Sequence, residues 1–206
     1  MKRIASLLLG LAMAAAALSG CGAQGRETAA QEFPDAVSIV LSDDGIIVEG
    51  KAVSTDESAA VHTAHDIVCY EYGRDFTYGE GTEADEHTAE EAEAHTVVHI
   101  TQPGTYALSG TLSAGQIAVD LGEDAEDDPA AVVTLILNGV DITCTVAPAV
   151  IFYNVYECGS TDEDTASETV DTSAAGANVL IADGTINNVT GSYVAKIYKP
   201  ETVTLN

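Results

Sequence analysis

One short pattern occurs twice in this chain and constrains its fold more than any other feature. Residues 135–142 (LILNGVDI) and 180–187 (LIADGTIN) both place apolar residues before Asn-Gly or Asp-Gly. The two glycines lie 45 residues apart, and another strand-like run lies between them, which suggests a solenoid with about 20 to 25 residues per coil. Asn-Gly between strands is also the strongest short hairpin signal. We favour a bend between two faces of a solenoid at Asn138-Gly139 over a hairpin of a β-sandwich, because asparagines such as Asn187 and Asn188 can stack at equivalent bends.

Short strand-like runs make up most of the chain after residue 96 and also occur before residue 54. The strand-like runs are 37–53, 97–101, 104–110, 115–120, 132–143, 149–153 and 178–182. Acidic loops separate several of them, and no run after 96 has helical periodicity. Residues 54–96 break the pattern, and Thr88-Ala-Glu-Glu91 within them fits a capping box. We therefore predict an all-β body with an insertion near 54–96 that carries one short helix near 88–95.

The N-terminus predicts export. Met1-Lys2-Arg3 is basic, residues 4–18 are apolar or small apart from one serine, and Leu-Ser-Gly-Cys ends the segment. The apolar run is too short for a membrane span and typical of a signal peptide, which we expect to form a signal helix over 1–20. The ending resembles the lipobox of bacterial lipoproteins, in which the cysteine, here Cys21, receives lipid. The resemblance implies a lipidated Cys21 and a flexible tether over 21–35, followed by one domain over 36–206 on the extracellular face of the cell membrane.

The charge of the chain limits its partners. Once Lys2 and Arg3 leave with the signal, 5 of the 7 basic residues remain against 33 acidic ones, a formal charge of −28. A surface this acidic argues against nucleic acid and against direct adsorption to anionic lipid, so the membrane contact is expected through the lipid alone. Because 46% of residues are hydrophobic, a core is available and the chain is not an acidic disordered tail.

The cysteines leave two readings open. Cys69, Cys144 and Cys158 remain beside the predicted lipid site. Cys144 and Cys158 have the chemistry to pair outside the cell, or to act as small buried hydrophobic residues. We favour burial.

Residues 100–120 (ITQPGTYALSGTLSAGQIAVD) and 133–143 (VTLILNGVDIT) resemble the opening coils of clostridial carbohydrate-binding domain-containing lipoproteins. The resemblance covers roughly 37–199. It implies a right-handed parallel β-helix like that of pectate lyases, binding to cellulose or acidic plant polysaccharide, and calcium. Members of this family continue through further coils, so the resemblance also implies that the domain is incomplete at its C-terminal end.

Two acidic loops are candidates for calcium, which takes six to eight oxygen ligands. Their carboxylates are Asp120, Glu123, Asp124, Asp127 and Asp128 in one loop, and Asp162, Glu163 and Asp164 in the other. Neither loop has the EF-hand spacing, and solvated acidic loops are the plain alternative. An acidic polysaccharide would need such cations, because a surface of −28 repels it unless a metal bridges the carboxylates.

A neutral glucan needs aromatic faces instead. Tyr70, Tyr72, Phe76 and Tyr78 lie at near-alternate spacing and are candidates for carbohydrate binding. The alternative is that they form core where the insertion packs.

Catalysis is not expected. The lyases that share the implied fold use an Arg or Lys base, and the basic residues beyond the tether form no recognisable arrangement; they are Lys51, Arg74, Lys196 and Lys199. The chain also lacks a nucleophile elbow, a phosphate-binding glycine loop and a Cys-x-x-Cys pair.

Two other functions stay open as alternatives to polysaccharide binding. One is a structural or adhesive surface protein whose acidic loops only solvate it. The other is surface capture of zinc by His62 and His65 with His87 and His95, although exposed histidines without metal are the simpler interpretation.

Overall fold

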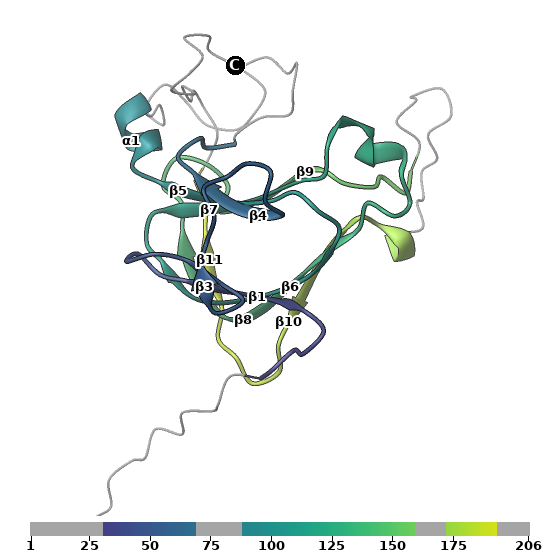
Figure 1. Cartoon of the computed structure of the whole chain (residues 1–206), viewed down its shortest axis with the longest axis horizontal. Coiled ribbons are helices and arrows are strands. Elements are labelled where there is room, and N and C mark those ends of the chain that lie inside the picture. Colours follow the sequence, from purple (N-terminus) through teal and green to yellow (C-terminus); the bar gives the residue numbers. More distant parts are fainter. Residues whose placement is uncertain (1–30, 69–87, 160–171, 193–206) are drawn as a thin grey trace, which may run out of the picture.

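The computed structural model describes residues 31–68, 88–159 and 172–192 (Figure 1). They are mostly β-structure in two sheets, which do not close into a barrel. The strands are β1 (Val37–Leu41), β2 (Ile47–Val48), β3 (Lys51–Ala52), β4 (Val61–Ala64), β5 (Thr96–Ile100), β6 (Gly104–Leu112), β7 (Gly115–Asp120), β8 (Val133–Thr143), β9 (Val150–Asn154), β10 (Ala177–Ile181) and β11 (Asn188–Thr190). The helical segments are α1 (Ala89–Glu93) and the 3₁₀ turns η2 (Glu123–Asp127) and η3 (Thr172–Ala174). The all-β prediction is confirmed for the described residues.

The chain passes back and forth between the two sheets. The seven-stranded sheet has the order β10-β8-β6-β1-β2-β3, with β11 also paired to β8, and the four-stranded sheet has the order β4-β5-β7-β9. From β5 to β10, successive strands alternate between the sheets, and each pairs in parallel with the strand two places along the chain. The antiparallel pairs are β1–β2, β2–β3 and β4–β5. Parallel neighbours are therefore joined through the opposite sheet rather than by hairpins.

Asn138-Gly139 is a bend and not a hairpin, as the repeat predicts. Both residues lie inside β8, whose first part pairs with β10 and whose last part pairs with β11. The register with β6 shifts at the same point. Gly139 has φ 83° and Gly184, in the equivalent Asp-Gly, has φ 75°. Both backbones are left-handed, a conformation that glycine adopts without steric strain.

A side chain from the last described repeat fastens this bend. The amide oxygen of Asn187 accepts hydrogen bonds from the backbone N–H groups of Gly139 (2.9 Å) and Val140 (2.8 Å). The predicted stacking of asparagine side chains at equivalent bends is not what the described residues show: Asn187 bonds the backbone of the preceding bend instead of another asparagine side chain. It supplies an acceptor where the irregular strand leaves two donors unpaired.

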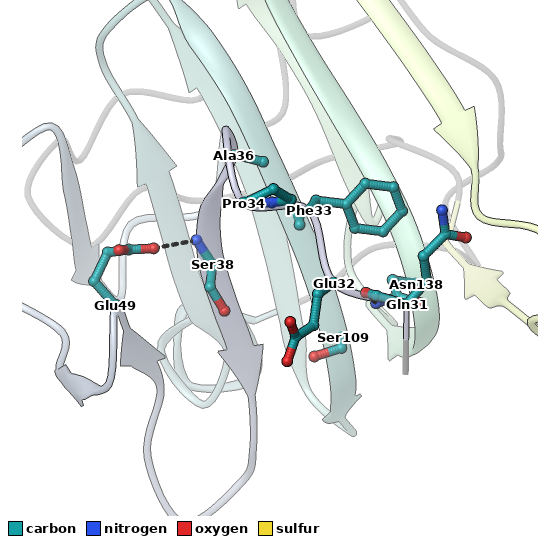
Figure 2. Close-up of a pocket in the computed structure, with 10 residues that line it drawn as sticks. Gln31, Glu32, Phe33, Pro34, Ala36, Ser38, Glu49, Ser109 and Asn138 are labelled. Atoms are coloured by element: carbon teal, nitrogen blue, oxygen red, sulfur yellow. Dashed lines mark hydrogen bonds between the residues drawn. The ribbon is translucent and has the colours of Figure 1, made fainter. Parts of the chain in front are cut away.

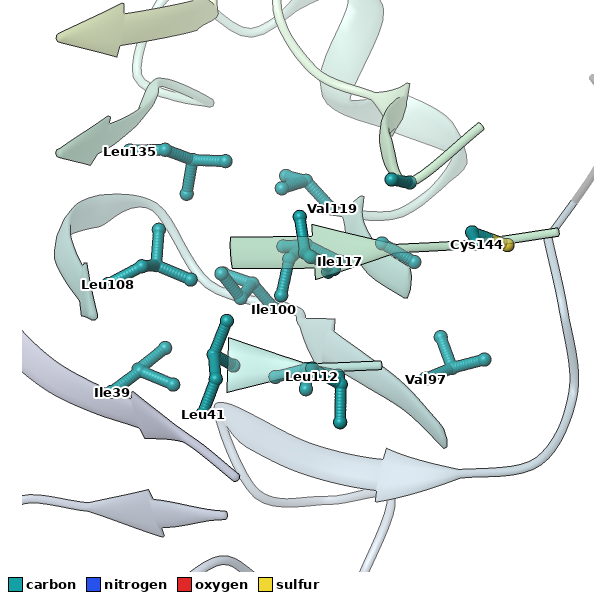
Figure 3. Close-up of a cluster of buried hydrophobic side chains, with 14 of the residues drawn as sticks. Ile39, Leu41, Val97, Ile100, Leu108, Leu112, Ile117, Val119, Leu135 and Cys144 are labelled. Atoms are coloured by element: carbon teal, nitrogen blue, oxygen red, sulfur yellow. The ribbon is translucent and has the colours of Figure 1, made fainter. Parts of the chain in front are cut away.

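The core lies between the two sheets (Figure 3). In the seven-stranded sheet Ile39, Leu108 and Leu137 are register neighbours and are 0%, 1% and 8% exposed. Their counterparts across the core come from the four-stranded sheet and include Ile100, Ile117 and Val119 (Figure 3). Burial of one such side chain stabilises the fold by about 1.5–3 kcal/mol.

The interior rows reach the surface at the last described strands. Ile181 continues the row of Leu137 and is 69% exposed, and Val179 continues the row of Leu135 and is 50% exposed. Val189 on β11 continues the row of Ile142 in the same way. Among the described strands, these side chains have a neighbouring strand on one side, whereas the side chains of the core rows have one on each side.

The predicted short helix is present and is capped as its sequence indicates. The Thr88 hydroxyl accepts from the Glu91 backbone N–H (3.2 Å), and the Glu91 carboxylate accepts from the Thr88 N–H (2.8 Å). This capping box satisfies donors that the first turn would otherwise leave free. Among the described residues, no helix has the length and apolar character needed to cross a membrane.

Neither described cysteine forms a disulfide. Cys144 is 1% exposed and packs in the core, and Cys158 is partly buried. Burial raises the pKa of the Cys144 thiol, which keeps it uncharged. The preference for burial over pairing is confirmed for Cys144, and Cys69 lies outside the described residues.

Candidate functional site

A pocket of about 430 Å³ lies on the outer face of the seven-stranded sheet (Figure 2). On β1 and β6 the lining side chains Ser38, Ala107 and Ser109 alternate with the inward Ile39 and Leu108, so they point away from the core. A segment before β1, residues 31–36, forms the other wall, and we call it the strap and the cavity the strap pocket. Within the described ranges the lining residues are Gln31, Glu32, Phe33, Pro34, Ala36, Ser38, Glu49, Ala107, Ser109 and Asn138. The volume falls within the range of small-molecule sites, about 300–1,000 Å³.

The strap is held over the sheet by a turn and by one side-chain hydrogen bond. The Ala36 N–H donates to the Phe33 carbonyl (3.0 Å), and Pro34 sits at the second position of this turn, where its fixed φ is favoured. At the other end, Asn138 Nδ2 donates to the Gln31 carbonyl (2.8 Å). Figure 2 shows the Phe33 ring over the outer face of the sheet beside Asn138. The pocket thus has an aromatic wall supplied by a segment that the chain places before its first strand.

Asn138 carries an unsatisfied acceptor. The residue is 8% exposed, and its Oδ1 is buried without a hydrogen-bond partner among the described residues. Leaving a buried polar atom unpaired costs about 1–3 kcal/mol. The opposite orientation of the amide would set Oδ1 against the Gln31 carbonyl, so the bond from Nδ2 fixes the orientation. A ligand group that donates a hydrogen bond to Oδ1 would therefore remove this cost and gain binding free energy.

Glu49 lies at the other end of the pocket in a strained backbone conformation. It has φ 50°, and no other non-glycine residue in the described ranges has a positive φ. With Gly50 (φ 73°) it forms the two-residue loop between β2 and β3. Two positive φ angles are the pattern of the hairpin turns that usually contain Asn-Gly, and a side chain such as that of Glu49 costs about 1–2 kcal/mol there. One carboxylate oxygen accepts from the Ser38 N–H (Figure 2).

The described wall of the strap pocket is rich in acceptors. Glu32 and Glu49 contribute carboxylates, which only accept hydrogen bonds when ionised, and Asn138 contributes the unpaired oxygen. None of the lining residues that the structure describes is Lys, Arg or His. Lys51 is the single Lys or Arg of the described ranges, and it does not line the pocket. The pocket suits a ligand that donates several hydrogen bonds and carries no negative charge.

The predicted calcium ligands of the first loop are spread along the turn after β7. Asp120 Oδ1 accepts from the Gly122 N–H and from Asn154 Nδ2, and Asp128 Oδ1 accepts from the Ala130 N–H. Glu123, Asp124 and Asp127 lie in η2 and are exposed. Within the described ranges no three His, Cys, Asp or Glu side chains are grouped as a metal site. Asp162, Glu163 and Asp164 lie outside the described residues.

The aromatic candidates for sugar binding also lie outside the described residues. These are Tyr70, Tyr72, Phe76 and Tyr78. Of the residues that the structure describes, Phe33 contributes an aromatic side chain to the strap pocket.

The prediction of exposed histidines is wrong for His62 and His95, and correct for His65. His62 is 5% exposed because it faces His99 across the β4–β5 pair, with the rings stacked at 4.8 Å. His99 in turn bonds Asp66 through Nε2 (2.8 Å). His65 is exposed, and its Nδ1 contacts the His95 carbonyl (2.9 Å) instead of sharing a site with His62. The two imidazoles proposed for zinc therefore have separate partners.

His95 is buried in a structural role. It is 3% exposed, its Nδ1 contacts the Glu91 carbonyl (2.8 Å), and its Nε2 accepts from the Thr145 N–H (3.2 Å). Because Nε2 accepts a backbone N–H, the proton of the ring is on Nδ1. His95 thus links the end of α1 to the turn after β8, and His87 lies outside the described residues.

Sequence reasoning missed the members of the strap pocket. Asn138 was identified as a bend residue, but not as a pocket residue, because the strap that packs on it is more than 100 residues away in sequence. Phe33-Pro34, just before the first strand, is a local signal of a turn, and this turn places the Phe33 side chain over the sheet. Glu49-Gly50 is a second signal, since Glu before Gly in a two-residue loop is an unusual choice.

One family model matches part of the chain. Residues 94–172 match a family described as carbohydrate-binding domain-containing protein. The matched part runs from just before β5 to beyond β9, and contributes Ala107, Ser109 and Asn138 to the pocket. No curated protein and no solved structure matches the chain.

Proposed function

We propose that this chain binds polysaccharide through the strap pocket and does not catalyse its cleavage. The observation that carries the proposal is the combination of an aromatic wall and convergent acceptors on the outer face of the sheet. Sugar rings present C–H faces that stack on aromatic side chains, and hydroxyls that donate to carboxylate and amide oxygens. The match of residues 94–172 to a carbohydrate-binding domain-containing family supports the same ligand class.

The parallel pairings support a finer proposal for the architecture. We propose that the two sheets are faces of the first coils of a right-handed parallel β-helix. Each pass from one sheet to the other and back makes one coil, and the Asn-Gly and Asp-Gly bends recur at equivalent positions. In such a solenoid the outer faces of successive coils form one continuous surface, which suits an extended polymer.

The location of the protein at the cell surface is also a proposal. The signal-like segment and Leu-Ser-Gly-Cys favour a lipid on Cys21 that holds the domain on the extracellular face of the membrane. Calcium remains a proposal that rests on the acidic loops and on the charge of the chain. Its expected role is to bridge an acidic polysaccharide to the loops rather than to the strap pocket.

A structural or adhesive function is the second candidate, because of the exposed apolar row at β10 and β11. Val179, Ile181 and Val189 continue core rows but face solvent. Such an edge pairs readily with further strands.

Retention on immobilised polysaccharide tests the proposed function. The full chain is passed over cellulose and over polygalacturonate, with calcium and with chelator, after circular dichroism has confirmed β-structure. We expect retention on at least one polysaccharide. If the folded protein passes freely through both columns in both buffers, polysaccharide binding is refuted and the structural role is favoured.

A further inference from the structure

The charge of the strap pocket carries an inference about the ligand that rests on the proposed function. We propose that this pocket takes a sugar unit without negative charge, and that Asn138, Glu32 and Glu49 recognise its hydroxyl groups as acceptors without a bound cation. Uronic acids, and with them the acidic polysaccharides, are excluded from this pocket.

Asn138 provides the first step. The residue is more than nine-tenths buried at the edge of the pocket, and its Oδ1 has no partner among the described residues, while Nδ2 already donates to the Gln31 carbonyl. The unmet need is therefore for a donor, which a sugar hydroxyl supplies. We expect the ligand to reach this oxygen by a small displacement of the strap at Gln31, where one side-chain hydrogen bond within the described residues attaches it.

The carboxylates provide the second step. Glu49 gives one oxygen to the Ser38 N–H and keeps further acceptor capacity, and Glu32 is exposed from the strap (Figure 2). A carboxylate accepting from a neutral hydroxyl makes a charge-assisted hydrogen bond, about twice as strong as a neutral one. A uronate in the same place meets two like charges, with no Lys, Arg or His in the described part of the wall. The same pocket that strengthens binding of a neutral sugar thus repels an acidic one.

Phe33 provides the third step. Its ring is partly buried and lies over the outer face of the sheet beside Asn138 (Figure 2). An aromatic wall flanked by acceptors fixes a pyranose by its apolar face and its hydroxyl edge together. None of these contacts requires a metal ion.

The test compares neutral and acidic oligosaccharides of equal length. Isothermal titration of the full chain measures affinity for cellopentaose and for penta-galacturonate, each with calcium and with chelator. The pocket variant carries Glu32→Gln and Glu49→Gln, and the control variant carries Glu57→Gln and Glu90→Gln. Both variants change the net charge by the same amount, and the control residues are exposed and do not line the pocket.

We expect cellopentaose to bind equally with calcium and with chelator. The pocket variant should weaken it roughly tenfold, because two charge-assisted bonds become neutral ones, while the control variant leaves it unchanged. Calcium-dependent binding of penta-galacturonate that the pocket variant abolishes would overturn the proposal. Calcium-dependent binding that the pocket variant leaves intact, with no binding of cellopentaose, would place the site elsewhere and overturn the proposal while polysaccharide binding stands. Binding of neither sugar by the folded protein would refute the proposed function itself.

Discussion

Replacing Asn187 by alanine removes the acceptor that fastens the bend of β8. The side-chain oxygen accepts from Gly139 N–H at 2.9 Å and from Val140 N–H at 2.8 Å. Val140 is 2% exposed, so its N–H would be left unpaired in the interior at a cost of about 1–3 kcal/mol. Gly139 is exposed, and its N–H turns to water at a cost of about 0.5–1 kcal/mol. We expect Asn187→Ala to lower the free energy of unfolding by about 1.5–4 kcal/mol, the sum of the two contributions.

Thermal and urea unfolding of matched variants measure this effect. For a chain of this size, 1 kcal/mol corresponds to about 2–4 °C, so the Tm should fall by roughly 3–16 °C. Asn188→Ala is the control, since Asn188 is the neighbouring residue on β11 and is exposed. We expect the control to shift the Tm by less than about 2 °C, as surface substitutions usually do. Equal shifts for the two variants would refute the role of Asn187 in fastening the bend.

Three further predictions concern single positions. Gly110→Ala should lower the free energy of unfolding by about 2–5 kcal/mol, and Gly139→Ala by only about 1–2 kcal/mol. Both residues have a positive φ, but only the methyl group added at Gly110 meets a β1 carbonyl oxygen, at 2.3 Å. Similar losses for the two variants in urea unfolding would contradict this reasoning. Ser113 donates two hydrogen bonds to the Asp43 carboxylate, one from its hydroxyl and one from its backbone N–H, and both lower the pKa of Asp43 below its usual range. This contact therefore stabilises the fold at neutral pH, and the stabilisation is lost as the pH falls through the lowered pKa. Ser113→Ala should raise the pKa of Asp43 in an NMR titration, and an unchanged value would show that the backbone bond alone sets it. Glu49→Asn should change the free energy of unfolding by less than about 1 kcal/mol from that of the original chain, because Asn tolerates the left-handed backbone. Glu49→Val should lower the free energy of unfolding by more than about 1 kcal/mol. The reverse order in urea unfolding would contradict the strained backbone at this position.

Local signals in the sequence predicted much of the β body. The repeat around Gly139 and Gly184 identified a bend whose left-handed glycines the structure confirms, and the capping box located α1. These features depend on residues close together in the chain, where spacing and backbone preference decide the structure. Cys144 was also placed correctly, as a small hydrophobic residue in the core.

The features that sequence reasoning missed depend on long-range contacts. His62 is buried because β4 pairs with β5 and brings His99 opposite to it, a pairing that no local pattern reveals. The strap pocket joins Gln31 to Asn138 and the β2–β3 loop to β1. The pocket depends on the strand register, which places Ser38, Ala107 and Ser109 on the outer face of the sheet beneath the strap.

The most direct measurement of sugar binding at the strap pocket is an NMR titration of the isotope-labelled chain with cellopentaose. We predict that the largest shifts occur at the Asn138 side-chain amide and at the backbone amides of Ser38 and Ser109, which surround the pocket. Asp124 and Asp127, in the acidic turn after β7, should shift little, because they do not line the pocket. Shifts centred on that turn, with Asn138 unaffected, would contradict the assignment of the strap pocket as the sugar-binding site.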